Sequence, residues 1–141
     1  SSMRTGGATG TAIVRSEQHN PELPNHMKER ILLVVGCTDL LSQMAQLCVS
    51  KGAKLVDEVS SRAAGLQRID ENEYDLVVCD DCLGDGTTDM VIIRMRIKNH
   101  NVPIICFSND WATRTCMWER GCTNVVDKAG ILAALEKAMT N

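Results

Sequence analysis

Five short apolar runs, each rich in valine, isoleucine or leucine, recur from residue 31 onward and limit the folding options of this chain more than any other feature. They lie at Ile31–Val35, Lys54–Val59, Asp75–Asp80, Val102–Phe107 and Asn124–Asp127. Nearly continuous apolar runs of this length are typical of strands buried on both faces of a parallel sheet. Helical patterns separate the runs, so the sequence predicts an α/β fold with helices on both faces of the sheet.

The segments between the runs carry the spacing of amphipathic helices. The first such helix face consists of Leu40, Leu41, Met44, Leu47 and Cys48. The last consists of Ile131, Leu132, Leu135 and Met139. The intervening helices have less regular apolar faces and are predicted at about Ser61–Glu71, Gly86–Ile97 and Asp110–Arg120.

Composition restricts the class of protein. The 141 residues suit one domain with a single core. The net charge of -3 and the absence of a basic block exclude an evident nucleic-acid footprint. No apolar run approaches the ~18 residues of a membrane span, so we expect a cytoplasmic protein without membrane contact of its own. Seven cysteines, mostly within apolar runs, favour reduced and buried thiols over a disulfide framework.

Residues 1–29 differ from the rest of the chain. They are rich in Gly, Ser and Thr, contain two prolines, and have one short apolar pair, Ile13–Val14. This composition is typical of a flexible leader or linker, and we expect the folded domain to comprise residues 30–141. Such a leader, without an output domain, is also what a fragment of a hybrid kinase would show.

Polar residues follow the predicted strands at the point where each strand ends. Gly36 and Cys37 follow the first strand, Asp80 ends the third, Ser108 follows the fourth and Lys128 follows the fifth. Right-handed crossovers bring these carboxyl ends to one rim of the sheet, where ligand sites of such folds lie. A carboxylate that can act as nucleophile would meet a hydroxyl and an ammonium that can hold transferred oxygens. The sequence therefore indicates phosphoryl chemistry.

Residues 30–140 resemble the receiver domain of two-component response regulators. The match rests on "YDLVVCD" ending in Asp80, "VPIICFS" ending in Ser108, and "GCTNVVDK" ending in Lys128. The resemblance implies a flavodoxin-like parallel sheet in the order 2-1-3-4-5. It also implies that Asp80 is the phosphoacceptor, with Ser108 and Lys128 as phosphoryl-binding and switch residues. A signalling module of this kind is not an enzyme and acts through protein partners, among which a histidine kinase or hybrid-kinase domains are candidates.

The metal site of the family is altered in this chain. Gly36 and Cys37 stand where receivers carry the two acids that hold Mg2+, an ion that requires hard oxygen ligands. Asp39 lies too far along the chain, and strand alternation predicts that Asp81 points away from Asp80. We expect no cofactor beyond weakly bound Mg2+, so phosphorylation at Asp80 should be impaired.

Three further positions depart from the family pattern. Gly84 replaces a common proline, Val125 replaces the aromatic switch residue, and Ala129 replaces the proline after the lysine. The chain is thus similar to a degenerate receiver, or pseudo-receiver. A cis peptide bond is not expected before Ala129.

Other interpretations of these residues stay open. Cys37 could serve as the nucleophile of a phosphocysteine or redox site at the end of the first strand. Cys79 and Cys82 form a C-x-x-C pair, for which core packing of Cys79 is the favoured interpretation. Ser108 could cap the next helix, and Lys128 could simply pair with Asp80.

Trp111, Thr115 and Trp118 share one face of the predicted fourth helix. Core packing is the default expectation for tryptophan, and a partner-binding patch is the alternative.

Overall fold

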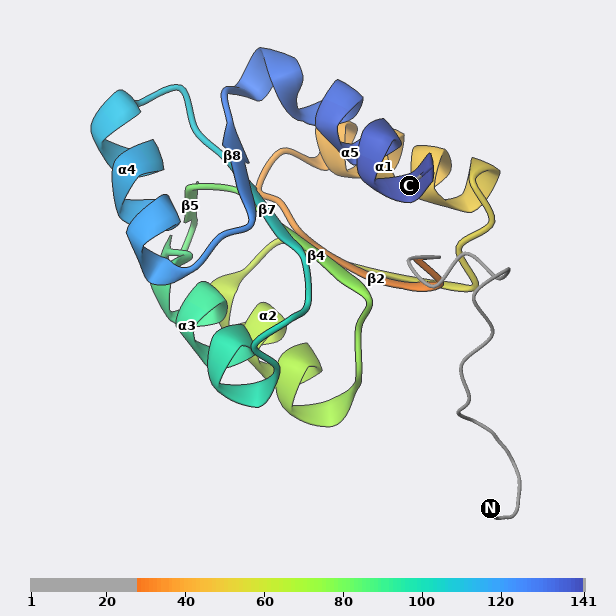
Figure 1. Cartoon of the computed structure of the whole chain (residues 1–141), viewed down its shortest axis with the longest axis horizontal. Coiled ribbons are helices and arrows are strands. Elements are labelled where there is room, and N and C mark those ends of the chain that lie inside the picture. Colours follow the sequence, from red (N-terminus) through yellow and green to blue (C-terminus); the bar gives the residue numbers. More distant parts are fainter. Residues whose placement is uncertain (1–27, 141) are drawn as a thin grey trace.

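The computed structural model describes residues 28–140 and contains one five-stranded parallel sheet (Figure 1). The strands lie in the order β3 (Leu55–Val59), β2 (Arg30–Val34), β4 (Leu76–Cys79), β7 (Ile104–Phe107) and β8 (Asn124–Val126). All four neighbouring pairs are parallel. Counted along the chain, this order is the predicted 2-1-3-4-5, and the prediction is confirmed.

Helices cover both faces of the sheet, as the alternating pattern predicts (Figure 1). One face packs against α1 (Thr38–Ser50) and α5 (Ile131–Thr140). The other packs against α2 (Arg62–Glu71), α3 (Asp89–Lys98) and α4 (Trp111–Arg120). The central strands are buried throughout because their side chains enter both cores, as their continuous apolar sequence requires.

The described part of the chain begins at residue 28. Residues 1–27, which include most of the predicted leader, lie outside the described residues. Glu29 already belongs to the sheet edge, since its carbonyl accepts hydrogen bonds from the backbone of Lys54 and Leu55. Between residues 28 and 140, no helix combines the length and apolar character needed to cross a lipid bilayer.

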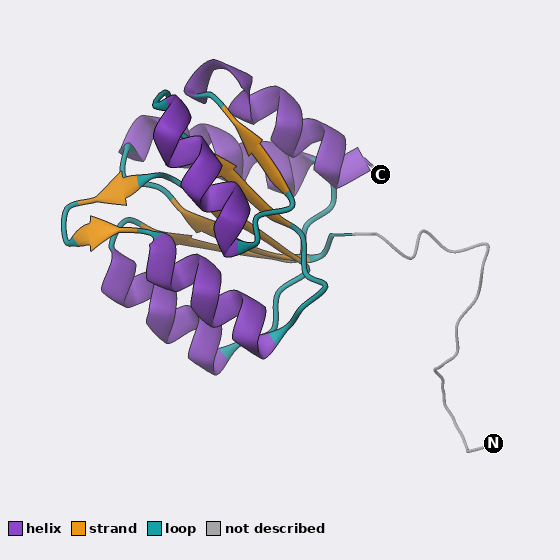
Figure 2. Ribbon diagram, turned by 60° about the vertical axis from the view of Figure 1, so that its left-hand side comes forward, coloured by secondary structure: helices purple, strands orange, loops and turns teal. Residues whose placement is uncertain are grey.

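A small antiparallel hairpin follows β4 and was not predicted. It consists of β5 (Cys82–Leu83) and β6 (Gly86–Thr87), and it projects beyond the sheet in Figure 2. The Asp85 carboxylate in its turn accepts hydrogen bonds from the first backbone N–H groups of α2 at Arg62 and Ala63. The hairpin occupies residues that the apolar pattern assigned to a helix, so α3 begins at Asp89 and not at Gly86.

The expectation of reduced thiols does not hold for one pair of cysteines. Cys106 in β7 and Cys122 after α4 form a disulfide. The remaining five cysteines of the described region are free. Sequence spacing gave no sign of this pair, because the two residues meet only when β8 is placed next to β7.

We predict that thiol counting will detect this bond. Rapid alkylation of the denatured chain without reductant should label five of the seven cysteines, and all seven after reduction. Reduction should also lower the free energy of unfolding by up to ~3 kcal/mol, the value expected for a loop of about this length. The measurements are intact mass and urea denaturation. Seven labels without reductant would contradict the disulfide.

Candidate functional site

Asp80 lies at the carboxyl end of β4 and is almost completely buried, with 5% of its surface exposed. Its carboxylate accepts two backbone hydrogen bonds, from the Gly36 N–H at 3.0 Å and from the Asp81 N–H at 2.8 Å. Its own carbonyl accepts the hydroxyl of the buried Thr88 at 2.5 Å. The residue is therefore held from both sides, by the end of β2 and by the segment that follows it.

Burial dominates the acid–base behaviour of Asp80. Removal from water raises the pKa of this carboxyl above its ordinary value, and the neighbouring Asp81 carboxylate adds to the rise. The backbone hydrogen bonds from Gly36 and Asp81 oppose it without cancelling it. The pKa of Asp80 is therefore higher than that of an exposed aspartate.

Asp81 does not point away from the site, and that expectation was wrong. Its carboxylate accepts the Ser108 hydroxyl at 2.8 Å and is partly exposed. Partial burial acts to raise its pKa, but hydrogen bonds from Ser108 and from the Asp80 side chain, together with the charge of Lys128, outweigh it and leave the pKa lowered. β4 ends at Cys79, so strand alternation no longer governs the direction of this side chain.

Ser108 connects the rim to α4. Its side chain is fully buried, and its hydroxyl oxygen accepts the backbone N–H of Asp110 at 3.1 Å. Its carbonyl accepts the Arg114 guanidinium at 2.6 Å. The N-cap of α4 is Asp110, whose carboxylate accepts the Thr113 N–H, so Ser108 is not the helix cap. The serine instead joins Asp81 to the first turn of α4.

Lys128 lies at the start of η1 (Lys128–Gly130), after β8. Its backbone N–H donates to the Asn109 side chain at 2.9 Å, and its ammonium acts electrostatically on Asp81. Within the described part of the chain, no ion pair joins Lys128 to Asp80, so the structure does not support the interpretation as an Asp80–Lys128 pair. The peptide bond before Ala129 is trans, as predicted.

The residues around Asp80 do not fit a Mg2+ ion. Gly36 offers a backbone N–H at this point, and a donor cannot ligate a cation. A side chain at Gly36 would begin 3.6 Å from Asp80 Oδ2, 3.6 Å from the Cys82 carbonyl oxygen and 3.5 Å from the Leu83 side chain. Among residues 28–140, no group of three or more His, Cys, Asp or Glu side chains is arranged to hold a metal.

The three cysteines near the rim differ in accessibility. Cys37 is exposed and is the N-cap residue of α1. Cys79 is fully buried in the core, and burial together with the charge of Asp80 raises the pKa of its thiol to about 12. Because a protonated, inaccessible thiol is a poor partner for exchange, Cys79 and the exposed Cys82 are not a redox pair.

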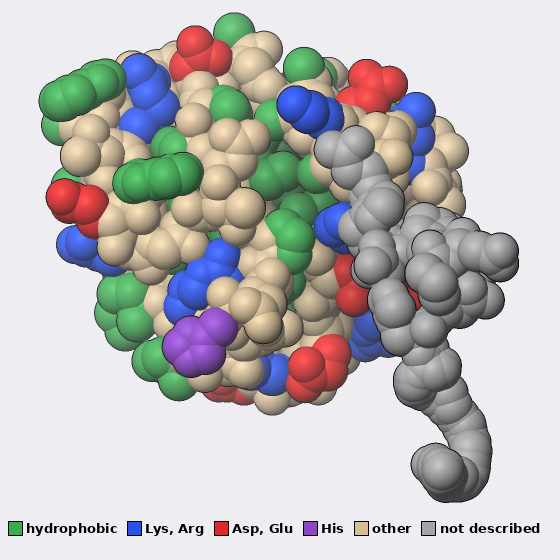
Figure 3. Space-filling view, in the orientation of Figure 1, with side chains coloured by type: hydrophobic (Ala, Val, Ile, Leu, Met, Phe, Trp, Pro, Cys, Tyr) green, Lys and Arg blue, Asp and Glu red, His purple; other side chains and the backbone are tan. Residues whose placement is uncertain are grey.

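Trp111 and Trp118 are not core residues. They are 72% and 60% exposed, and they lie two helical turns apart on the same face of α4. Figure 3 shows hydrophobic side chains on the surface over this helix. The default expectation of core packing was wrong, and the alternative, a patch that contacts a partner, is the one that the exposure supports.

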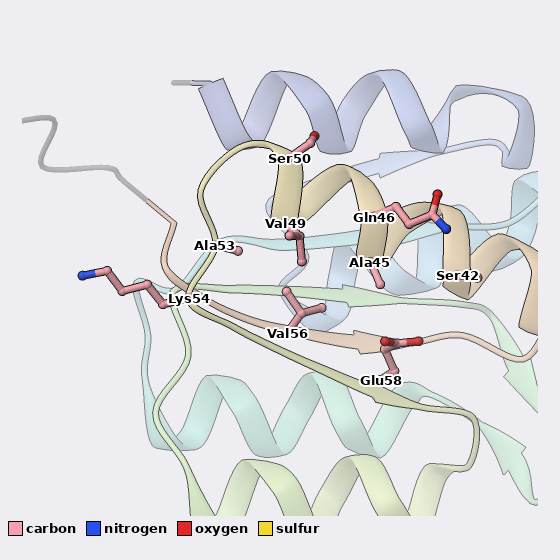
Figure 4. Close-up of a pocket in the computed structure, with 9 residues that line it drawn as sticks. All are labelled: Ser42, Ala45, Gln46, Val49, Ser50, Ala53, Lys54, Val56 and Glu58. Carbon is pink, nitrogen blue, oxygen red and sulfur yellow. The ribbon is translucent and has the colours of Figure 1, made fainter.

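A pocket lies away from the rim, between α1 and the edge strand β3. Figure 4 shows Ala45 and Val49 of α1 facing Val56 of β3. Lys54 and Glu58 border it. Ser42, Gln46 and Ser50 complete its polar lining.

Comparison with known proteins identifies the fold. No family model and no curated protein matches the chain. A CheY-like receiver domain protein from Methanospirillum hungatei aligns with a TM-score of 0.66 at 17% identity, over 79% of this chain and 97% of the other. The receiver domain of a sensor histidine kinase from Pseudomonas aeruginosa, with magnesium in its active site cleft, gives 0.66 at 18% identity, over 80% and 98%. A response regulator from Burkholderia pseudomallei with a phosphorylated aspartic acid and calcium gives 0.68 at 17% identity, over 79% and 69%.

These likenesses confirm the predicted receiver-like fold. At identities of 17% and 18%, these similarities show the fold alone.

We predict that one substitution will create a magnesium site. Gly36→Asp adds a carboxylate next to Asp80 without a close contact, since its Cβ meets nothing nearer than 3.5 Å. Mg2+ affinity should rise roughly ten-fold or more, about 1.4 kcal/mol, measured by isothermal titration calorimetry. The matched control is Gly84→Asp, whose Cβ has nothing within 4 Å and adds the same charge away from the site. Tight Mg2+ binding by the unmodified chain, lost in Asp80→Asn, would contradict this account.

The raised pKa of Asp80 predicts a pH-dependent difference between the wild type and Asp80→Asn. The unfolded carboxyl titrates near ~3.9, and the folded one titrates higher. The contribution of Asp80 to stability is therefore full below the unfolded pKa and lost as pH rises through the folded pKa. The free energy of unfolding of Asp80→Asn should increase relative to that of the wild type as pH rises from about 4 through the folded pKa, as measured by urea denaturation. A difference in the free energy of unfolding that stays constant with pH would refute the raised pKa of Asp80.

Proposed function

We propose that this chain is a receiver-like signalling module of a two-component or phosphorelay system that acts by binding protein partners. The observation that carries the proposal is the pair of exposed tryptophans on α4, in a domain with the receiver fold. Signalling domains of this fold work through surfaces and not through turnover, so the module is not an enzyme. Histidine kinases and hybrid-kinase domains are the partner class, which is consistent with the fold of the sensor-kinase receiver from Pseudomonas aeruginosa.

Trp111 and Trp118 expose large apolar side chains to water, which is unfavourable in free energy. A tryptophan side chain carries a large apolar surface, and its burial is a frequent source of binding energy at protein interfaces. Two of them on one helix face form a compact apolar patch that water solvates poorly. A partner that covers this patch would gain most of its affinity from these two residues.

Phosphorylation at Asp80 is impaired in this proposal. The carboxyl is buried and engaged with two backbone N–H groups. A buried carboxyl is hard for a phosphodonor to reach, and no side chain at Gly36 or Cys37 offers the hard oxygens that would hold a charge-neutralising cation. Partner binding therefore does not require a phosphoryl group on Asp80.

The aromatic switch residue of the receiver family is absent from this domain. Val125 is half-buried against the α2–α3–α4 core and has no ring that could change position. The Ser108 hydroxyl is already engaged with Asp81. The alternative of a phosphocysteine at Cys37 is not favoured, because the segment that follows Cys37 is the helix Thr38–Ser50, which contains no glycine and forms no loop of consecutive backbone N–H groups around an anion.

We place the module in the cytoplasm, where two-component receivers act. The disulfide is compatible with that compartment only if it is protected from reductants. Both of its cysteines are buried, which slows attack by a thiolate.

Binding to purified histidine-kinase dimerisation domains and phosphotransfer domains from the source organism tests the proposal. Trp111→Ala and Trp118→Ala should each weaken the complex roughly ten-fold or more, about 1.4 kcal/mol, in biolayer interferometry. Asp80→Asn should leave affinity nearly unchanged. Ile97→Ala is the control, because Ile97 is 74% exposed but lies on α3.

Two outcomes would refute the proposal. One is that no domain of this class binds the folded chain. The other is that a complex forms but the tryptophan variants bind as tightly as the wild type, which would move the interface away from α4.

A further inference from the structure

The two adjacent carboxylates at the end of β4 do not have the neighbours that the sequence predicts for them. Asp80 faces inward and receives backbone N–H groups from Gly36 and Asp81. Asp81 is partly exposed and receives the Ser108 hydroxyl, and the Lys128 ammonium acts on it. The hydroxyl and the ammonium that the resemblance assigns to Asp80 therefore serve Asp81.

We propose that Asp81, and not Asp80, is the carboxylate of this rim that accepts a phosphoryl group. The proposal rests on the proposed receiver function and names the residue through which such a module would be modified. Three requirements meet at Asp81: solvent access, a hydroxyl within hydrogen-bond distance, and a nearby cation that offsets the charge of the phosphoryl oxygens. The Asp80 carboxylate is buried from solvent, and the Ser108 hydroxyl donates to Asp81 instead.

The chemical step is a transfer from an N-phosphoryl donor such as phosphoramidate. A carboxylate oxygen of Asp81 attacks phosphorus, the P–N bond breaks, and its electron pair leaves with the nitrogen. That nitrogen is already protonated in the donor, so it departs as ammonia without a general acid. The product is a mixed anhydride between the Asp81 carboxyl and phosphate. Ser108 and Lys128 then hold the phosphoryl oxygens by a hydrogen bond and by charge.

Modification of Asp81 would act directly on the helix that carries the tryptophans. Ser108 bonds to Asp81 through its hydroxyl, to Asp110 through the same oxygen, and to Arg114 through its carbonyl. A phosphoryl group on Asp81 changes the partner of the Ser108 hydroxyl and adds negative charge. The first turn of α4, with Trp111, is therefore the part of the surface that would respond.

The experiment incubates the full chain with phosphoramidate, with and without Mg2+, and follows intact mass. Borohydride reduction then converts the acyl phosphate to homoserine, and peptide sequencing by mass spectrometry locates it. We expect homoserine at position 81 in the wild type and in Asp80→Asn, and no phosphorylation in Asp81→Asn. Ser108→Ala should slow labelling of position 81 roughly ten-fold or more. Thermal melts establish that each variant is folded, and the wild-type mapping depends on no variant.

Homoserine at position 80, or labelling abolished by Asp80→Asn and kept by Asp81→Asn, would overturn the assignment and leave the receiver function intact. Absence of any phosphoryl adduct on the folded wild-type chain would also overturn it. The proposed function is judged separately, because it depends on the binding of the kinase-domain panel through the α4 tryptophans.

Discussion

The hydrogen bond between the Gly36 N–H and the Asp80 carboxylate is the interaction on which the arrangement of the rim depends. β2 and β4 are neighbours in the centre of the sheet, with Val34 opposite Cys79, so the residues that follow them meet above the core. A carboxyl in that position must find hydrogen bonds to compensate for lost water. Gly36 provides one from β2 and Asp81 provides another from its own segment. These two hydrogen bonds hold the Asp80 carboxylate in its buried position at the rim.

That inward position determines what its neighbour does. With Asp80 facing the protein, Asp81 is directed toward Ser108 at the end of β7. The hairpin and the residue after it reinforce the arrangement, because the Thr88 hydroxyl donates to the Asp80 carbonyl and the Asp85 carboxylate accepts the first backbone N–H groups of α2. The segment between β4 and α3 is consequently attached at both ends. The two acids therefore differ in their surroundings: Asp80 is buried and bound by backbone N–H groups, whereas Asp81 is partly exposed and accepts the Ser108 hydroxyl.

The α4 helix is fixed at both ends in a comparable way. At its beginning, Arg114 bonds to the Ser108 carbonyl. At its end, Arg96 donates to the Gly121 carbonyl at 2.8 Å, and the Cys106–Cys122 disulfide ties the following segment to β7. A helix held in this manner presents its exposed tryptophans in a preorganised position, which reduces the entropy lost when a partner binds.

The amino-acid sequence by itself determined the architecture and located the rim, because both follow from local patterns. Valine- and isoleucine-rich runs define buried parallel strands, and the handedness of the crossovers brings Asp80, Ser108 and Lys128 to one edge. Only the tertiary structure decided which carboxylate meets the hydroxyl, because the direction of Asp81 depends on where strand pairing ends and on contacts from residues 27 positions away. The same holds for the disulfide and for the exposure of Trp111 and Trp118. Those features depend on which elements become neighbours and which faces stay uncovered, and neither is encoded in the spacing of residues along one segment.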